Sequence, residues 1–146
     1  MPPKVSVLIC TRDRPDTVGQ AVDSVARCRF DDFDLHVMDQ STTDETRVIV
    51  ERLAEKFRDR VTIVYHHLDK AGLSRAYNTG IGVSTGEIVA CTDDDVIVSP
   101  DWLTRIVEAF DRDPELGLLY GMVLVPDSLK DARASGTIVP TLAPAS

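Results

Sequence analysis

Short apolar runs and amphipathic stretches alternate along most of this chain. The runs are rich in valine, isoleucine and leucine and nearly continuous, as in strands that are buried on both faces of a parallel sheet. Between them, apolar residues return every three or four positions, which is the pattern of helices buried on one side. Alternating strands and helices build βαβ units, so the sequence predicts an α/β fold in which helices flank a mostly parallel sheet. Strands are expected over residues 5–10, 33–38, 61–65 and 87–92, and helices over residues 16–27, 44–57, 73–83 and 100–110.

A further apolar run over residues 116–125 is interpreted as a fifth strand, and no periodic element is evident after it. Residues 1–125 are therefore expected to form one domain, followed over residues 126–146 by an irregular tail or the start of a further region. The helical periodicity also identifies side chains expected in the core: Val18, Ala21, Val22 and Val25, then Val48, Leu53 and Phe57, and finally Trp102, Leu103, Ile106, Val107 and Phe110.

Composition narrows the class of protein. The 24 acidic and 16 basic residues give a net charge of −8, which argues against a nucleic-acid-binding surface. No apolar run approaches the ~20 residues that span a membrane, although peripheral membrane association stays open. The three cysteines, Cys10, Cys28 and Cys91, lack C-x-x-C spacing, and two of them lie in predicted strands. We therefore expect buried thiols in a protein of the reducing cytoplasm.

Three consecutive carboxylates, Asp93, Asp94 and Asp95, follow the fourth predicted strand. Adjacent negative charges repel one another and favour a compensating cation. Mg²⁺ and Mn²⁺ take oxygen ligands and usually bridge one or two carboxylates to substrate phosphates. Ligands of open α/β sheets bind outside the carboxyl ends of the strands. The triplet therefore indicates a metal–phosphate site, and a solvated acidic turn before the next helix is the alternative.

Other nucleotide-binding signatures do not fit this sequence. The three glycines of residues 80–86 follow a predicted helix and precede a strand, whereas the dinucleotide fingerprint follows a strand and opens a helix. A Mg²⁺-dependent phosphotransfer or receiver-type domain also uses carboxylates at strand ends. It requires a lysine after a late strand, however, and this chain has Pro126 and Asp127 there.

Four short blocks together resemble the family-2 glycosyltransferases of GT-A fold. They are residues 5–14, 37–44, 72–78 and 92–95, and their order and spacing match the family over about residues 4–125. The resemblance implies a Rossmann-like GT-A fold and an inverting transferase. Such an enzyme binds a nucleotide-diphosphate sugar, here most simply a UDP-sugar, through a divalent cation, Mg²⁺ or Mn²⁺, and transfers the sugar to an acceptor.

The resemblance also implies roles for particular residues. Thr11 and Arg12 would line the nucleotide pocket, and Asp39 and Gln40 would lie beside the base and ribose. The family often has an acidic residue where this chain has Gln40, so the base is not fixed by this position. The family also often has an arginine directly before the asparagine of the third block. Here the nearest arginine is Arg75, two residues earlier than that position, which makes it a candidate for binding ribose or phosphate.

The acidic triplet corresponds to the family's D-x-D motif. Asp93 and Asp95 would hold the cation that stabilises the leaving nucleoside diphosphate, and Asp94 would lie nearer the ribose or diphosphate. Arg14, with the more distant arginines, is interpreted as an ordinary surface charge.

The acceptor-binding half and the general base of the family follow this nucleotide-binding half, and the sequence stops before any matching motif. Asp127 and Asp131 match nothing in the family and are interpreted as solvated acids. The chain is thus expected to be the donor-binding part of a transferase, truncated before the acceptor half. A binding-only or inactive donor-domain fragment is the alternative.

Overall fold

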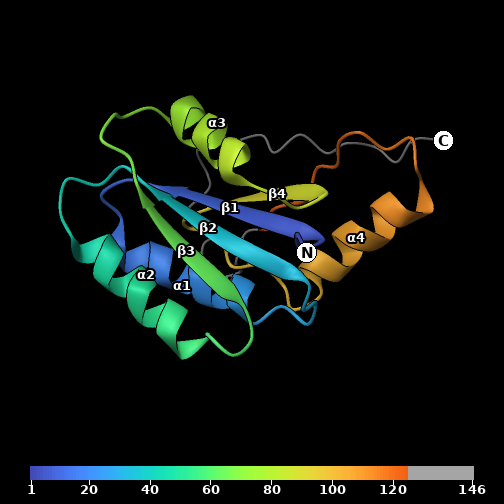
Figure 1. The fold of residues 1–146 in the computed structure, drawn as a ribbon, viewed down its shortest axis with the longest axis horizontal. Coiled ribbons are helices and arrows are strands. Elements are labelled where there is room, and N and C mark those ends of the chain that lie inside the picture. Colours follow the sequence, from blue (N-terminus) through green and yellow to red (C-terminus); the bar gives the residue numbers. More distant parts are fainter. Residues whose placement is uncertain (125–146) are drawn as a thin grey trace, which may run out of the picture. The chain divides into compact units, whose positions relative to one another are not determined.

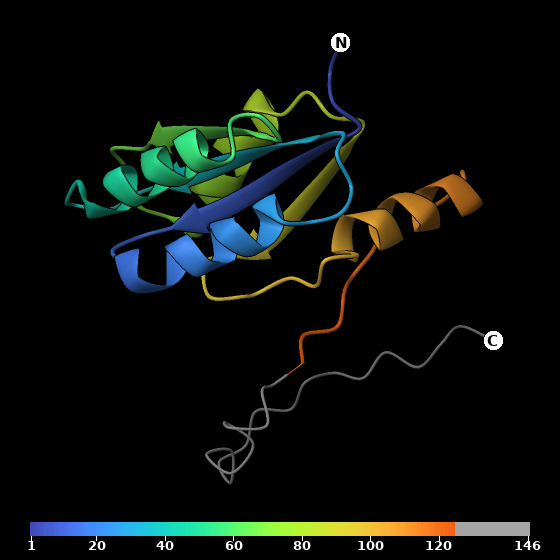
Figure 2. The ribbon, with the colours of Figure 1, turned by 90° about the horizontal axis from the view of Figure 1, so that it is seen from below.

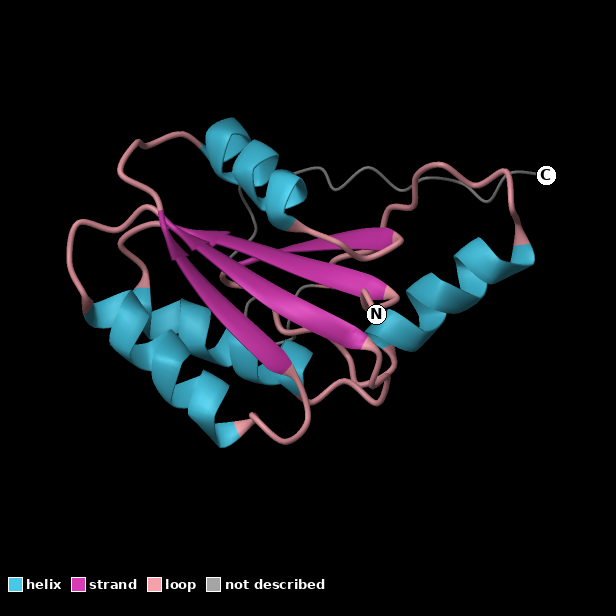
Figure 3. Ribbon diagram, in the orientation of Figure 1, coloured by secondary structure: helices cyan, strands magenta, loops and turns pink. Residues whose placement is uncertain are grey.

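The computed structural model describes residues 1–124 of the chain. Within them four strands and four helices alternate, as Figures 1 and 3 show. The order predicted from the sequence is confirmed, with element ends within about two residues of those expected. The strands are β1 (Val5–Thr11), β2 (Phe33–Asp39), β3 (Thr62–His67) and β4 (Ile88–Asp93), and the helices are α1 (Pro15–Ala26), α2 (Glu45–Lys56), α3 (Leu73–Val83) and α4 (Trp102–Arg112).

The four strands form one parallel sheet in the order β3-β2-β1-β4. β1 pairs with β2 and with β4, so that Thr11 lies opposite Asp39 and Cys10 lies opposite Asp93. Asp39 in turn lies opposite His67 of β3. Because the strands are parallel, their carboxyl ends meet at one edge of the sheet, where the arrowheads of β1, β2 and β3 lie together in Figure 1.

Helices cover both faces of the sheet. α1 and α2 lie against one face, and α3 lies against the other (Figures 1 and 2). The larger core is formed on the α1 side, where complete burial of each aliphatic side chain is worth about 1.5–3 kcal/mol. Its fully buried members include Val5, Val7 and Ile9 of β1, Val18, Val22 and Val25 of α1, Leu35 and Val37 of β2, Val50 of α2 and Leu103 of α4.

The apolar face of α2 differs from the one expected. Val48 is half exposed, at 50%, whereas Val50 is completely buried. Thr46, Val50, Leu53 and Phe57 pack inward and are spaced four, three and four residues apart, which keeps them on one side of a helix. Val48 lies two positions from Val50, about 200° around the axis. The prediction for Val48 was wrong because an apolar residue on the solvent side was read as part of the stripe.

The burial of the cysteines was predicted correctly for two of the three. Cys10 and Cys28 are buried, Cys91 is exposed, and all three are free thiols. Exposed and buried residues alternate along β4, and Cys91 shares the exposed set with Val89. β4 is at the edge of the sheet, so an apolar run there did not mean burial on both faces.

The predicted fifth strand is not formed over the described residues of the segment 116–125. Residues 117–124 contain no strand, and six apolar side chains among them are exposed. A strand requires a hydrogen-bonded neighbour, and an apolar run by itself does not provide one. The rest of that run and the predicted tail, residues 126–146, lie outside the described residues, and the predicted boundary near residue 125 stays a prediction. The exposed side chains are Leu118, Leu119, Tyr120, Met122, Val123 and Leu124.

β3 continues through His66 and His67, two residues beyond the strand end expected from the sequence. His66 Nε2 lies 3.0 Å from Nδ1 of the buried His36, and the two rings stack. His36 Nε2 in turn lies 3.2 Å from a carboxylate oxygen of Asp34. Burial, together with the neighbouring His36 ring, lowers the pKa of His66. His66 is therefore a strand residue held in its neutral form.

Acid should destabilise the fold partly through His66. Because its pKa is lower in the folded protein, the unfolded chain takes up the proton first as the pH falls below about 6.5. The stabilisation is present above that pH and is lost below it. His66→Gln should reduce the loss of unfolding free energy between about pH 7 and pH 5 by up to about 1 kcal/mol, measured by urea denaturation. Equal pH dependence in wild type and His66→Gln would contradict the assignment.

Candidate functional site

A polar cavity lies at the carboxyl ends of β1, β2 and β3. It has a volume of about 410 Å³. This is the edge of an open α/β sheet at which ligands bind, and two of the residues predicted for nucleotide binding, Arg12 and Gln40, are in its wall. The lining residues are Arg12, Gln40, Ser41, Thr42, Thr43, Asp44, His67, Leu68, Asp69 and Ala71.

Gln40 connects the end of β2 to the loop before α3. Its side-chain nitrogen Nε2 donates to the carbonyl oxygens of Lys70 at 2.8 Å and Gly72 at 2.9 Å, and its backbone N–H donates to Thr11 at 3.0 Å. Two carbonyl acceptors fix the orientation of the amide, because only the nitrogen can donate to both. The oxygen Oε1 is then the group of this side chain that is left to accept a hydrogen bond from a ligand.

Asp39 is completely buried, and both of its carboxylate oxygens already accept hydrogen bonds. Oδ1 accepts from the backbone N–H of Ser41 at 2.9 Å, and Oδ2 accepts from the hydroxyl of Tyr65 at 2.7 Å. Burial and this bond raise the pKa of Tyr65 well above its usual range. Asp39 therefore holds the turn after β2 against β3, beneath the cavity rather than on its wall.

The acidic triplet lies at the end of β4, next to the end of β1. Asp94 is buried, with 6% of its surface exposed, and accepts a 2.7 Å hydrogen bond from the hydroxyl of Thr11. Asp93 and Asp95 are exposed. Asp94 thus faces into the protein, whereas the two carboxylates on either side of it face solvent.

Arg14 lies against this triplet, which sequence reasoning missed. Its Nη1 nitrogen is 3.1 Å from Oδ1 of Asp94 and 3.3 Å from Oδ2 of Asp95. The hydrogen bond to Asp94 and the charges of both carboxylates raise the pKa of the guanidinium further above its usual value. The available signal was positional: Arg14 follows the end of β1 by three residues, and β1 pairs with β4.

Thr11 and Arg75, which were also predicted to bind the nucleotide, do not line the cavity. Thr11 is buried, and its hydroxyl faces Asp94 instead of the cavity. Arg75 is exposed on α3, outside the wall of the cavity, and has no ion pair within residues 1–124. Tyr77 packs beside Cys10 on the α3 side of the sheet, and burial, with Cys10 and Asp93 nearby, raises its pKa to about 12. The structure brings together Thr11, Asp94 and Asp95, and Arg12 with Gln40, but not Arg75 with either group.

The carboxylates at the end of β4 suit a cation that is coordinated jointly by the protein and by a ligand better than a cation that protein side chains enclose alone. No group of three or more histidine, cysteine, aspartate or glutamate residues within the described part of the chain is arranged to enclose a metal ion. Asp93 and Asp95 nevertheless offer exposed carboxylates at one strand end. Magnesium-like ions in phosphate-binding sites are commonly held by one or two carboxylates, with the ligand's phosphates and water completing the shell. The residues present fit that arrangement.

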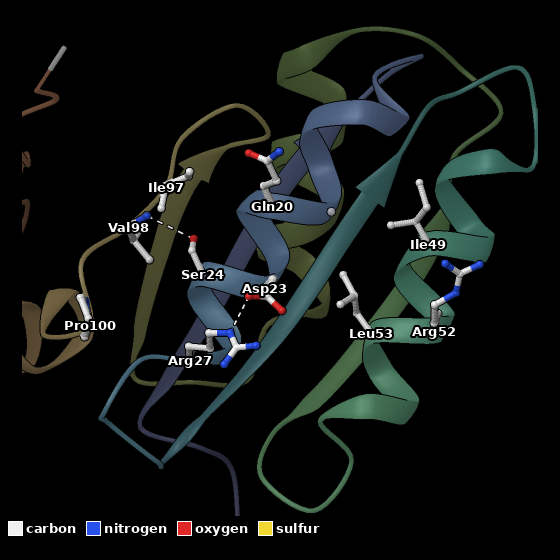
Figure 4. A pocket seen from close by; sticks show the side chains of 11 residues that line it. Gln20, Asp23, Ser24, Arg27, Ile49, Arg52, Leu53, Ile97, Val98 and Pro100 are labelled. Atoms are coloured by element: carbon white, nitrogen blue, oxygen red, sulfur yellow. Dashed lines mark hydrogen bonds and ion pairs between the residues drawn. The ribbon is translucent and has the colours of Figure 1, made fainter. Parts of the chain in front are cut away.

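A second, larger groove lies elsewhere, between α1, α2 and residues 97–100 (Figure 4). It measures about 630 Å³ and has mostly apolar walls, including Ile49, Leu53 and Ile97. Ser24 accepts a hydrogen bond from the backbone N–H of Val98 across it at 3.2 Å. None of the residues predicted for ligand binding lines this groove, so it does not belong to the candidate site.

No helix within residues 1–124 combines the length and the apolar character that crossing a membrane requires.

Comparison of sequences identifies the family. The model described as glycosyl transferase family 2 matches residues 6–139. An uncharacterized glycosyltransferase of Nostoc sp. is 27% identical over 139 residues, which cover 95% of this chain and 42% of the Nostoc protein. A glucosyl-dolichyl phosphate glucuronosyltransferase of Haloferax volcanii is 29% identical over 127 residues, which cover 85% of this chain and 39% of that protein.

Solved structures agree with the sequence comparison. The mannosyltransferase PcManGT from Pyrobaculum calidifontis, in complex with GDP-Man and Mn²⁺, superimposes with a TM-score of 0.69 at 30% identity, over 80% of this chain and 34% of that chain. Residues 1–349 of S. aureus TarS, in complex with UDP-GlcNAc, give a TM-score of 0.63 at 22% identity, over 75% of this chain and 31% of that chain, and show likeness of fold alone.

The chain spans less than half the length of each of these four proteins. The family match nevertheless covers most of the chain, and it supersedes the phosphotransfer or receiver-type alternative. The resemblance noted in the sequence is confirmed: this chain belongs to glycosyl transferase family 2 and has the GT-A fold.

Proposed function

We propose that this chain forms the donor-binding part of an inverting glycosyltransferase, which takes a nucleoside-diphosphate sugar with a divalent cation and transfers the sugar to an acceptor. One observation carries the proposal. The carboxyl ends of the parallel strands carry a polar cavity at β1, β2 and β3 and exposed carboxylates at the end of β4, which pairs with β1. A nucleoside and a diphosphate-bound cation require such neighbouring subsites.

The nucleoside is assigned to the cavity. Its volume of about 410 Å³ is in the range of small-ligand pockets. Oε1 of Gln40 would accept from a base N–H, and Arg12, whose side chain is about half exposed, would pair with ribose or phosphate oxygens. Uracil and guanine both offer a ring N–H to such an acceptor, so the UDP-sugar expected from the resemblance and the GDP-sugar of the mannosyltransferase are both donor candidates.

The diphosphate is assigned to the strand end of β4. Asp95 and Asp93 would hold the cation, and the Mn²⁺ of the related mannosyltransferase complex supports a divalent ion, with Mg²⁺ as the other candidate. When bound, the cation supplies Lewis-acid stabilisation of the charge that develops on the departing nucleoside diphosphate. Asp94, buried against Thr11, would keep the turn that presents its two neighbours.

The acceptor and the general base are not assigned to any described residue. Asp127 and Asp131 lie outside the described residues. Turnover is the observation that separates a transferase from a binding-only donor domain, the second candidate. A positioned base is worth roughly 10²–10⁴-fold in rate. A chain that binds the donor without supplying that base would show at most slow donor hydrolysis. The expected cytoplasmic location stays a prediction.

A nucleoside diphosphate should stabilise the protein only in the presence of a divalent cation. A ligand that binds the folded state alone adds RT ln(1 + [L]/Kd), or about 2.7 kcal/mol at 100-fold excess over Kd. The measurement is a thermal-shift panel of UDP and GDP, each with Mn²⁺, with Mg²⁺ and with a chelator. The matching nucleoside monophosphates are the control, because they lack the diphosphate that shares the cation. Equal stabilisation with and without chelator would show that binding does not require a metal ion. Absence of stabilisation by any diphosphate would contradict the proposed donor site.

A further inference from the structure

One guanidinium nitrogen of Arg14 donates hydrogen bonds to two carboxylates of the acidic triplet. Nη1 is 3.1 Å from Asp94 and 3.3 Å from Asp95. A guanidinium Nη carries two hydrogens and can donate to both. In the absence of any cation, Arg14 is therefore the positive charge that compensates this part of the site.

The two ion pairs of Arg14 differ in their surroundings. Asp94 has a side chain that is 9% exposed and also accepts from Thr11, so this carboxylate keeps its position whatever Arg14 does. The side chain of Asp95 is 52% exposed, and within residues 1–124 its only ion-pair partner is Arg14. Exposed ion pairs contribute little and exchange readily with other ions. The pair with Asp95 is thus the one that can open.

Arg14 is attached to α1 through its main chain. Its carbonyl oxygen accepts from the backbone N–H groups of Thr17 and Val18 in the first turn of α1, directly before Pro15. The side chain of Arg14 is 55% exposed. The side chain can therefore leave Asp95 without moving α1, while the residue stays beside the site.

We propose that Arg14 is a built-in counter-ion that occupies Asp95 until a divalent cation displaces it. This rests on the proposed function, because it takes Asp95 as a cation ligand. The Arg14 guanidinium and a divalent cation are both positively charged and both bind the carboxylate of Asp95. Each therefore weakens the binding of the other to Asp95. Arg14 lowers the affinity of the free protein for metal while stabilising the acidic turn in the free protein.

Titration with Mn²⁺ alone tests this competition. Arg14→Gln keeps a donor for Asp94 but removes the charge. It should bind Mn²⁺ about threefold to fivefold more tightly than wild type, measured from the electron paramagnetic resonance signal of free Mn²⁺. Arg14→Lys keeps the charge and should bind close to wild type, which guards against a folding defect in the first variant. Arg105→Gln removes an equal charge from the exposed pair with Asp101 and controls for net charge.

A double-mutant cycle separates competition from a general change in charge. In an Asp95→Asn background the Arg14→Gln substitution should no longer change Mn²⁺ affinity, because the contested carboxylate is gone. Equal Mn²⁺ affinity in wild type and Arg14→Gln overturns the proposal, as does an equal gain from Arg105→Gln.

Failure of this inference is distinguishable from failure of the proposed function. If neither protein binds Mn²⁺ alone, yet a nucleoside diphosphate with Mn²⁺ still stabilises both equally, Arg14 is not a competitor and the donor site stands. If cation-dependent stabilisation is also absent, the metal site itself fails, and the Arg14 proposal fails with it.

Discussion

Replacement of Asp39 by alanine should lower the free energy of unfolding by about 2–4 kcal/mol. The carboxylate is completely buried and accepts from Ser41 N–H and the Tyr65 hydroxyl, so its removal leaves two donors without their acceptor. The cost is large because both donors are held in a turn and a strand that cannot easily turn them toward water. Urea denaturation monitored by circular dichroism measures it.

Two further variants test whether the loss of stability in Asp39→Ala comes from its buried hydrogen bonds. Tyr65→Phe removes one of the two bonds and should cost about 1 kcal/mol, and adding it to Asp39→Ala should cost much less than it does alone. Asp59→Ala removes a carboxylate that is almost fully exposed and should change stability little. If Asp39→Ala were as stable as Asp59→Ala, Asp39 would not hold the turn, and a direct role at the ligand would have to be reconsidered.

The arrangement of strands and helices followed from the sequence because each strand is a nearly unbroken aliphatic run. The faces of the elements followed less well. Val48 is apolar but lies about 200° from the buried Val50 on α2. Cys91 lies in an apolar run, but its strand is at the edge of the sheet. Which side of an element is covered depends on its neighbours, and a single sequence does not name them.

The prediction of the candidate site from the sequence was limited in the same way. The sequence marked Asp93, Asp94 and Asp95 as a group, but not which carboxylate turns inward. That choice follows from strand register: β1 pairs with β4, so Thr11 and Arg14 lie where they meet Asp94. Likewise the burial of Asp39 depends on Tyr65 of β3, from a part of the chain that no local pattern connects to it.

Asp95→Asn should remove the cation-dependent part of nucleoside-diphosphate binding. The substitution keeps the size of the side chain but removes the charge that the cation requires. Loss of an outer-shell partner of a metal ligand costs about 10–100-fold in affinity, so loss of a direct ligand should lower affinity in Mn²⁺ by at least that much. In the presence of chelator neither wild type nor Asp95→Asn should bind the diphosphate measurably. Stability should change little, because Asp95 is half exposed and its pair with Arg14 is at the surface. Isothermal titration calorimetry of the diphosphate, once in Mn²⁺ and once in chelator, measures the two affinities.

Asp59→Asn is the matched control, because it removes the same charge from a side chain that is 95% exposed and adjoins the end of α2. It should retain wild-type affinity in Mn²⁺, which separates loss of a metal ligand from loss of general negative charge. Asp94→Asn should behave differently from both, since its partner Thr11 is buried, and it should lower stability as well as affinity. Wild-type affinity of Asp95→Asn in Mn²⁺ would exclude Asp95 as a ligand. Asp93 would then be the remaining exposed carboxylate of the triplet to substitute.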